Sequence, residues 1–307
     1  MFSFQKHTYL YATIITILMG HNMLLVKSLL YTVEPLVLTF VRMTLTALAL
    51  LVLCFFVYGV VKPTMEQWKL LTLIGFFGVF VHQITLAIGL ETSHATNGAL
   101  ILGLNPIATT LLGALLLKET LFRRHYIGVI LSFIGICFIV FRGFSSFSFT
   151  SGDILLFFSM LAQALSFVYT RKLAGQMKII PVTAYSYLVG AGMLLVLPFV
   201  QDMSSIFTFS AFIWLKILLA SVVLTAFGFI GFNLCIQRLG AGGASIFLNV
   251  ITVTALIGAV IYLGEELLIQ HVFGFLFISV GIWVATHHKD PAVKTDLQNR
   301  SHSVSSS

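Results

Sequence analysis

LKETLFRRHYIG (residues 117–128) and LGEELLIQHVFG (residues 263–274) repeat leucine, glutamate and glycine at matching positions, 146 residues apart. The same shift, with no gap, superposes further landmarks: Pro35 on Pro181, Trp68 on Trp214, Ala95 on Ala241, and Gly135 on Gly281. Self-similarity at one fixed spacing indicates an internal duplication, which decides the architecture before any single residue does. We therefore expect two related halves, residues 1–146 and 147–288.

The composition is that of a membrane protein. Charged residues make up 9% of the chain and apolar residues 59%, whereas a soluble domain has about 25% charged residues. The net charge of +7 comes from basic residues that stand singly or in pairs between apolar runs. Because they form no basic face, we expect a lipid bilayer and no nucleic acid as partner. The three cysteines lie in separate apolar runs, so we expect no metal site and no cofactor.

Apolar runs long enough to cross a bilayer recur along the chain. A helix needs about 20 apolar residues to span the hydrocarbon core. The runs are continuous, whereas the strands of a membrane barrel alternate apolar and polar residues. We predict an all-α integral membrane fold with ten transmembrane helices, at about 8–27, 35–60, 68–90, 94–117, 125–141, 152–171, 181–200, 211–236, 241–263 and 270–287.

The basic residues predict the orientation of these helices. With a cytoplasmic N-terminus, 13 basic residues lie in cytoplasmic segments and only Lys27, Arg142 and Lys216 in outer ones. We therefore expect both termini in the cytoplasm, with a disordered polar tail over 289–307. Five spans per half is an odd number, so the halves must be inverted relative to each other. Inverted five-helix repeats are typical of secondary transporters, which bind substrate near the midplane.

A family resemblance adds to this interpretation. GLETSHATNGAL (89–100), Pro106, LLKE (116–119) and Gly128 resemble the fourth-to-fifth-helix signature of EamA-type carriers in the drug/metabolite transporter superfamily. A weaker form recurs as LGAGGAS (239–245) and LGE (263–265), although Thr252 stands where Pro106 would be repeated. The resemblance covers residues 8–287. It implies a 5+5 inverted repeat, export of small metabolites such as amino acids, and a cavity lined by helices 1, 3, 4, 6, 8 and 9.

Polar side chains at mid-depth are the candidate binding residues, because burying them in hydrocarbon is costly without a function. We predict that the substrate contacts His21, Asn22, His82, Gln83, Asn105, Gln163, Asn233 and Asn249. His82, and after it His21, are the candidates for proton coupling, since imidazole changes charge near neutral pH. The alternative for His82 is a neutral side chain bonded to a neighbouring helix.

Arg42 is the only basic residue well inside a predicted span. A buried cation usually has a partner, so we interpret Arg42 as one member of a structural ion pair with Glu91 or Glu34. A contact with an anionic ligand is the alternative. Gly128, Gly135, Gly274 and Gly281 are small residues one heptad apart, and we expect them to pack helices closely together.

Several functions are disfavoured by what the sequence lacks. No acidic residue lies at mid-depth to neutralise a hydrophobic cation, and no phosphate-binding loop powers the chain by hydrolysis. No nucleophile motif or histidine box indicates an enzyme. We predict a secondary active transporter of the bacterial plasma membrane that exports small polar metabolites such as amino acids by alternating access, with proton coupling as a further hypothesis. The alternatives are a lipid-flipping protein, a non-transporting sensor and a carrier of anions such as sugar phosphates; monomer and homodimer both stay open.

Overall fold

The computed structural model describes residues 2–93, 101–118, 123–140, 150–263 and 269–286. These residues are nearly all helical, and a single isolated bridge joins Ala174 to Met177. The expected tail over 289–307 lies outside them. The α-helices are α1 (Phe2–Leu30), α2 (Pro35–Tyr58), α3 (Met65–Gly75), α4 (His82–Thr92), α6 (Asn105–Leu117), α7 (Arg123–Val140), α8 (Ser151–Leu173), α9 (Ile179–Leu194), α10 (Ala211–Leu218), α11 (Phe227–Leu239), α12 (Ala241–Ser245), α13 (Asn249–Leu263) and α14 (Ile269–Thr286).

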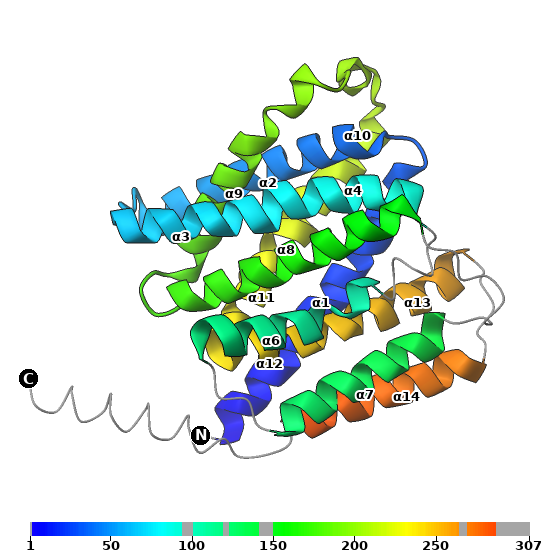
Figure 1. Ribbon diagram of the computed structural model, residues 1–307. Helices are drawn as coiled ribbons and strands as arrows, with labels where there is room; N and C mark the ends of the chain where they lie inside the picture. Colours follow the sequence, from blue (N-terminus) through cyan, green and yellow to red (C-terminus); the bar gives the residue numbers. More distant parts are fainter. Residues whose placement is uncertain (1, 94–100, 119–122, 141–149, 264–268, 287–307) are drawn as a thin grey trace, which may run out of the picture.

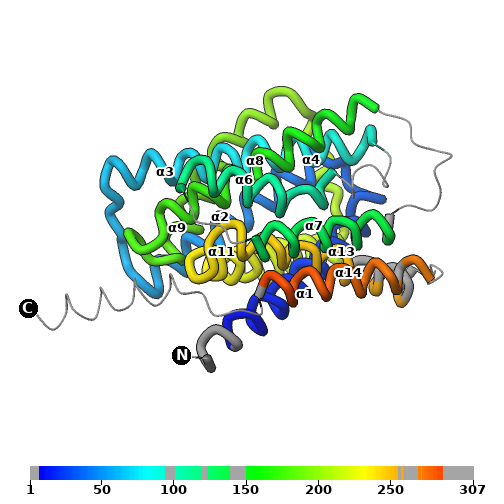
Figure 2. The backbone as a smooth tube through the Cα atoms, turned by 60° about the horizontal axis from the view of Figure 1, so that its bottom comes forward, coloured from blue at the N-terminus to red at the C-terminus, as the bar shows by residue number. Residues whose placement is uncertain are grey.

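Six helical stretches in the described part are long and apolar enough to cross a membrane: His7–Leu30, Pro35–Tyr58, Met65–Thr92, Ser151–Leu173, Ile179–Phe199 and Ala211–Leu239. Each coincides with one of the expected spans. Shorter apolar helices occupy Ile101–Leu117, Ala241–Thr254 and Val272–Ala285. The long axes run mostly along one direction (Figure 2). The chain is therefore a helical integral membrane protein.

Local capping fixes where α2 and α3 begin. Pro35 opens α2, where a missing N–H costs nothing, and the Glu34 carboxylate accepts a hydrogen bond from Val37 N at 3.3 Å. α3 begins with a capping box in which Thr64 N donates to Gln67 Oε1 at 2.9 Å and Gln67 N to Thr64 Oγ1 at 3.3 Å. Between them Gly59 takes a positive φ of 64° and ends α2. The α2–α3 hairpin is thus set by residues at its own turn.

Two long helices contain π-helical segments that the sequence did not reveal. Phe76–Val81 (η1) joins α3 to α4, and Leu219–Ala226 (η5) joins α10 to α11. The 146-residue shift carries η1 onto 222–227, which overlaps η5. π segments occur often at functional sites, because they re-aim the side chains around them. Both segments lie next to the polar clusters described below.

The four predicted packing glycines form the contact between α7 and α14, which lie side by side at the bottom of Figure 1. A Cβ atom added to Gly128 would come within 2.6 Å of Gly281 O, and one added to Gly135 within 2.6 Å of Gly274 O. Only a hydrogen atom fits between these backbones. The packing role of the glycines is confirmed. Each half contributes the same two positions, and they pair reciprocally.

Other helix contacts are reciprocal as well. α1 packs on α13, and the corresponding pair of the other half, α8 and α6, are also neighbours. α4 packs on α8, just as α11 packs on α1. α2 packs on its own counterpart, α9. Reciprocal contacts of this kind are what a two-fold relation between two like bodies requires.

Candidate functional site

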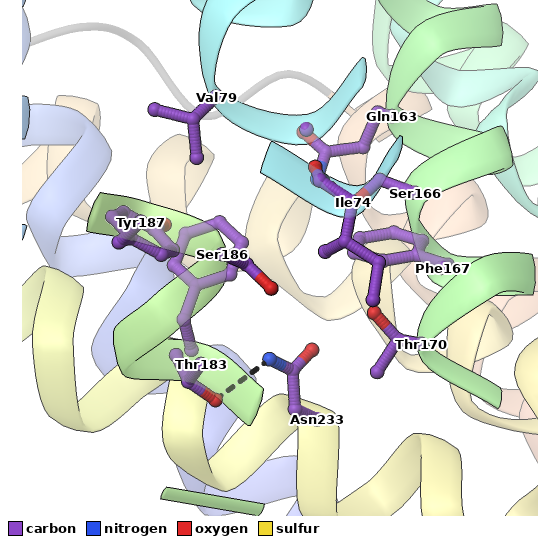
Figure 3. Close-up of a pocket in the computed structure, with 12 residues that line it drawn as sticks. Ile74, Val79, Gln163, Ser166, Phe167, Thr170, Thr183, Ser186, Tyr187 and Asn233 are labelled. Carbon is purple, nitrogen blue, oxygen red and sulfur yellow. Dashed lines mark hydrogen bonds between the residues drawn. The ribbon is translucent and has the colours of Figure 1, made fainter. Parts of the chain in front are cut away.

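A polar pocket lies inside the helix bundle. α3 and η1 from the first half form one wall, and α8, α9 and α11 from the second half form the others (Figure 3). The cavity has a volume of about 10 Å³, which is room for about one water molecule in this conformation. None of its lining residues carries a full charge. Its polar lining consists of Gln163, Ser166, Thr170, Thr183, Ser186, Tyr187 and Asn233.

α8 contributes one face of the pocket. Gln163, Ser166, Phe167 and Thr170 follow the i, i+3, i+4, i+7 spacing that brings side chains to the same side of a helix. All four are buried. Ser166 Oγ donates to Ile74 O across the pocket wall at 3.4 Å, whereas the Gln163 amide has no hydrogen-bond partner in the described part of the chain. Gln163 therefore keeps a donor and an acceptor for a ligand.

The opposite wall is held by a hydrogen bond between α9 and α11. Asn233 Nδ2 donates to Thr183 Oγ1 at 3.0 Å, shown as a dashed line in Figure 3, and Thr183 Oγ1 donates to Ile179 O at 2.9 Å. Ser186 Oγ donates to Val182 O at 2.7 Å. The hydroxyl protons are thus used within α9, and each of the two hydroxyl oxygens can accept one further hydrogen bond. The pocket offers uncharged donors and acceptors fixed on rigid helices.

Close backbone approach shapes the first-half wall. A Cβ atom at Gly78 would overlap the Ser166 side chain, and a Cβ atom at Gly190 would overlap Val79. Tyr187 and Phe229 stack edge to face, with ring centroids 5.5 Å apart, and form an apolar side of the pocket. The glycines allow α3, η1 and α9 to meet closely enough to enclose a small space.

Of the predicted binding residues, the pocket brings together Gln163 and Asn233. His82 is buried outside it, between α4 and α8, with Nδ1 at 2.8 Å from Ser159 Oγ and 3.1 Å from Ser159 O. Ser159 Oγ also lies 3.0 Å from His82 O. Gln83, the neighbour of His82, is partly buried and does not line the pocket. His82 is therefore bonded to a neighbouring helix, as its alternative interpretation expects.

The remaining predicted residues are dispersed. His21 is exposed, with Nδ1 at 3.0 Å from Ile17 O of its own helix. Asn105 is buried at the start of α6 and accepts a hydrogen bond from Thr109 Oγ1 at 2.9 Å. Asn249 is buried at the start of α13, and its Nδ2 has no partner. None of the three lines the pocket.

Arg42 and Asn22 form a second polar cluster with a residue of η5. Arg42 Nη2 donates to Thr225 Oγ1 at 3.3 Å, and Asn22 Nδ2 donates to the same oxygen at 2.9 Å. Within the described residues no ion pair joins Arg42 to Glu91 or Glu34: Glu91 is exposed, and Glu34 caps α2. The expected structural ion pair is therefore absent, and the cation is held by a hydroxyl.

The hydroxyl residues of both clusters were not among the predicted contacts. Serine and threonine are common in transmembrane helices, where they bond to the carbonyl one turn back, so a single one carries little signal. Ser166 and Thr170 do fall three and seven residues after Gln163, on its helical face. Thr183 and Ser186 share a face in the same way. Their spacing was the signal that the sequence offered.

Comparison with known proteins agrees with this architecture. The model of the EamA-like transporter family matches twice, over residues 6–141 and 150–286. The uncharacterized transporter YyaM of Bacillus subtilis (strain 168) is 25% identical over 80% of this chain and 82% of its own length. An uncharacterized transporter of Archaeoglobus fulgidus is 26% identical over 73% of this chain and 80% of its own.

A protein known from a crystal structure has the same fold, with a TM-score of 0.74 and 18% identity over 90% of this chain and 95% of its own. The two family matches cover both halves, which agrees with the duplication read from the sequence. Because the family model matches most of the chain, this chain belongs to the EamA-like transporter family.

Proposed function

We propose that the protein is a secondary active transporter that exports small polar metabolites, amino acids among them, by alternating access. The observation that carries the proposal is a pocket enclosed by helices of both halves, whose uncharged polar side chains come from α8, α9 and α11. A hydrogen-bonding cavity inside an apolar bundle is costly unless a polar solute occupies it. Membership of a transporter family supports the same conclusion.

In this proposal the two halves, residues 1–146 and 147–288, are five-helix repeats inverted relative to each other, giving ten membrane-spanning helices. The reciprocal contacts of α7 with α14, and of α1 with α13 against α8 with α6, support an inverted arrangement. Inverted halves provide two conformations of similar energy, since each half can adopt the shape of the other.

The uncharged lining favours neutral or zwitterionic solutes. A hydrophobic cation would need a carboxylate, and the lining holds none. The pocket extends from the middle of α8, α9 and α11, where Gln163, Tyr187 and Asn233 lie, toward the end of α8 and the start of α9. With both termini in the cytoplasm of a bacterium, these helix ends are cytoplasmic. The pocket would then receive solute from inside the cell, as an exporter requires.

Solute counterflow in proteoliposomes tests the proposal without knowledge of any coupling ion. The panel contains labelled amino acids, polyols, amides and amines. We expect saturable counterflow of at least one polar solute, weakened by Asn233→Leu and by Gln163→Leu. Lys216→Gln on α10, outside the pocket, is the matched control and should leave it unchanged.

The outcomes of this experiment separate the alternatives. If saturable counterflow is unchanged by both pocket substitutions, the proposed transport function stands and the pocket is not its binding site. No counterflow by folded protein would overturn solute transport and favour lipid flipping or a sensor.

Proton coupling through His82 is a further part of the proposal. Two observations support this coupling: His82 is buried in a span, and it lies at the start of α4, directly after η1. A coupled carrier should lose the acceleration of uphill transport by a pH gradient when His82 is replaced by Gln, while counterflow persists. Uphill transport by His82→Gln that still responds to the gradient would contradict the coupling.

A further inference from the structure

We propose that Arg42 and Asn22 bind the charged head of a zwitterionic solute, with its carboxylate on Arg42 and its ammonium on Asn22. This inference rests on the proposed transport function and assigns the substrate class. It starts from a buried guanidinium that has no anionic side chain beside it among the described residues.

The charge on Arg42 is uncompensated in the described part of the chain. The residue is 8% exposed, its Nη2 donates to a neutral hydroxyl, and its Nε is buried with no partner. Asp153, a buried acid in the described residues, is engaged elsewhere with Ser93 and Thr150. Leaving a buried cation without an anion is strongly destabilising, so a ligand carboxylate would remove a cost that the protein otherwise bears.

The guanidinium is the group suited to this ligand. Its donors form a planar fork that matches the two oxygens of a carboxylate. Arg42 is the only buried lysine or arginine among the described residues. One buried positive charge matches one negative charge, whereas a phosphate monoester would bring nearly two. The structure therefore favours a single carboxylate over a sugar phosphate.

Asn22 provides the complementary group. Its Nδ2 donates to Thr225 Oγ1, and its Oδ1 is buried with no donor beside it. Since Arg42 and Asn22 donate to the same oxygen, the unpaired donor Nε and the unpaired acceptor Oδ1 belong to one small cluster. An ammonium group donates a hydrogen bond to the unpaired acceptor Oδ1, and a carboxylate accepts one from the unpaired donor Nε. Together they describe the head of an amino acid.

The cluster adjoins the pocket at Tyr187. This residue lines the pocket and packs in one buried cluster with Met43 and Ala226, which directly follow Arg42 and Thr225 in the sequence. The body of a solute whose head is bound at Arg42 can therefore extend past Tyr187 toward Gln163 and Asn233. Thr225 fills the head-group position in the absence of solute: its oxygen accepts from both side chains and donates to Ala220 O at 2.7 Å.

The test uses an amino acid transported in the counterflow panel and three derivatives: its carboxamide, its N-acetyl form, and the N-acetyl carboxamide. Each carries its own label. We expect Arg42→Gln to raise the half-saturating concentration of the two carboxylates at least about tenfold, the effect of losing a charged hydrogen bond, and to spare the carboxamide. Asn22→Leu should raise the half-saturating concentration of the two compounds with a free ammonium and leave that of the N-acetyl form unchanged.

Thr225→Val is the matched control. It breaks the same two hydrogen bonds but keeps Arg42 and Asn22, so the preference for carboxylate over carboxamide should persist. Arg42→Lys keeps the charge and loses the fork, and should give an intermediate preference.

Three results would overturn the inference. If Arg42→Gln raises the half-saturating concentration of all four compounds equally, the cluster only holds α1, α2 and η5 together. If neutral solutes show counterflow and no amino acid does, the substrate class is wrong and the transporter stands. If folded protein gives no counterflow with any solute, the transport function itself fails, and the head-group site fails with it.

Discussion

Replacing Gly135 by alanine should destabilise the protein by forcing α7 and α14 apart. The added Cβ would lie 2.6 Å from Gly274 O and 2.8 Å from Ile278 Cγ1. The first of these atoms is backbone and moves only if a helix moves. Forcing an extra methyl group into a well-packed contact costs about 1–3 kcal/mol.

The matched control is Gly192→Ala on α9, where an added Cβ meets no atom within 4 Å. Alanine is better than glycine within a helix by about 0.5–1 kcal/mol, and this gain is common to both substitutions. The difference between the two variants therefore isolates the packing penalty of about 1–3 kcal/mol.

Thermal unfolding of the purified variants in detergent measures this difference. We expect Gly192→Ala to unfold at or above the temperature of the original protein, and Gly135→Ala to unfold several degrees below Gly192→Ala. Equal unfolding temperatures for the two variants would refute the close glycine contact, and with it the reciprocal pairing of the two helices.

Three further substitutions test other contacts. Gly78→Ala would place a Cβ atom in overlap with Ser166 Oγ and 2.8 Å from Ser166 Cβ, so it should push η1 away from α8 and lower both the unfolding temperature and counterflow; undiminished counterflow would count against the pocket. Tyr185→Phe removes the 2.7 Å hydrogen bond from the Tyr185 hydroxyl to Val61 O and should lower the stability to thermal unfolding by about 1 kcal/mol; an unchanged stability would show that this bond does not form. Ser159→Ala removes the hydroxyl that contacts His82 Nδ1 and donates to His82 O, while the backbone oxygen of residue 159 remains, and should cost a similar amount in the same measurement; a variant as stable as the original would show that this hydroxyl does not tie α4 to α8.

The duplication, the apolar helices and the packing glycines were predictable because each depends on a repeated or local pattern. Gly128 and Gly135 recur at one fixed spacing, and the backbone contact they make needs nothing but their size. Membrane-spanning length is likewise a property of one segment at a time. Such features can be predicted from the sequence because they do not depend on which distant residues come into contact.

The candidate site was predicted only in part, because a pocket depends on which helices meet. Gln163 and Asn233 both reach it, although they lie on helices far apart in the sequence. His82 has the same depth and polarity, yet it faces Ser159 on α8 and not the pocket. Depth alone does not say toward which neighbour a helical side chain points.

The fate of Arg42 illustrates the same limit. A buried cation in a sequence suggests a carboxylate partner, and Glu34 and Glu91 were the nearest along the expected helix ends. The structure gives it Thr225 instead, a residue 183 positions away whose place depends on a π segment. Helix periodicity predicts neither that segment nor the hydroxyl that it turns toward α2.

The π segments also carry a record of descent. A π turn needs one residue more than an α turn, because its hydrogen bonds reach one position further. If one half had gained such a residue after the duplication, the halves would align only with a gap. They align at a constant shift of 146, and η1 and η5 fall at overlapping positions. A single gain of this residue in the ancestral half, before the duplication, accounts for both π segments and for the alignment without a gap.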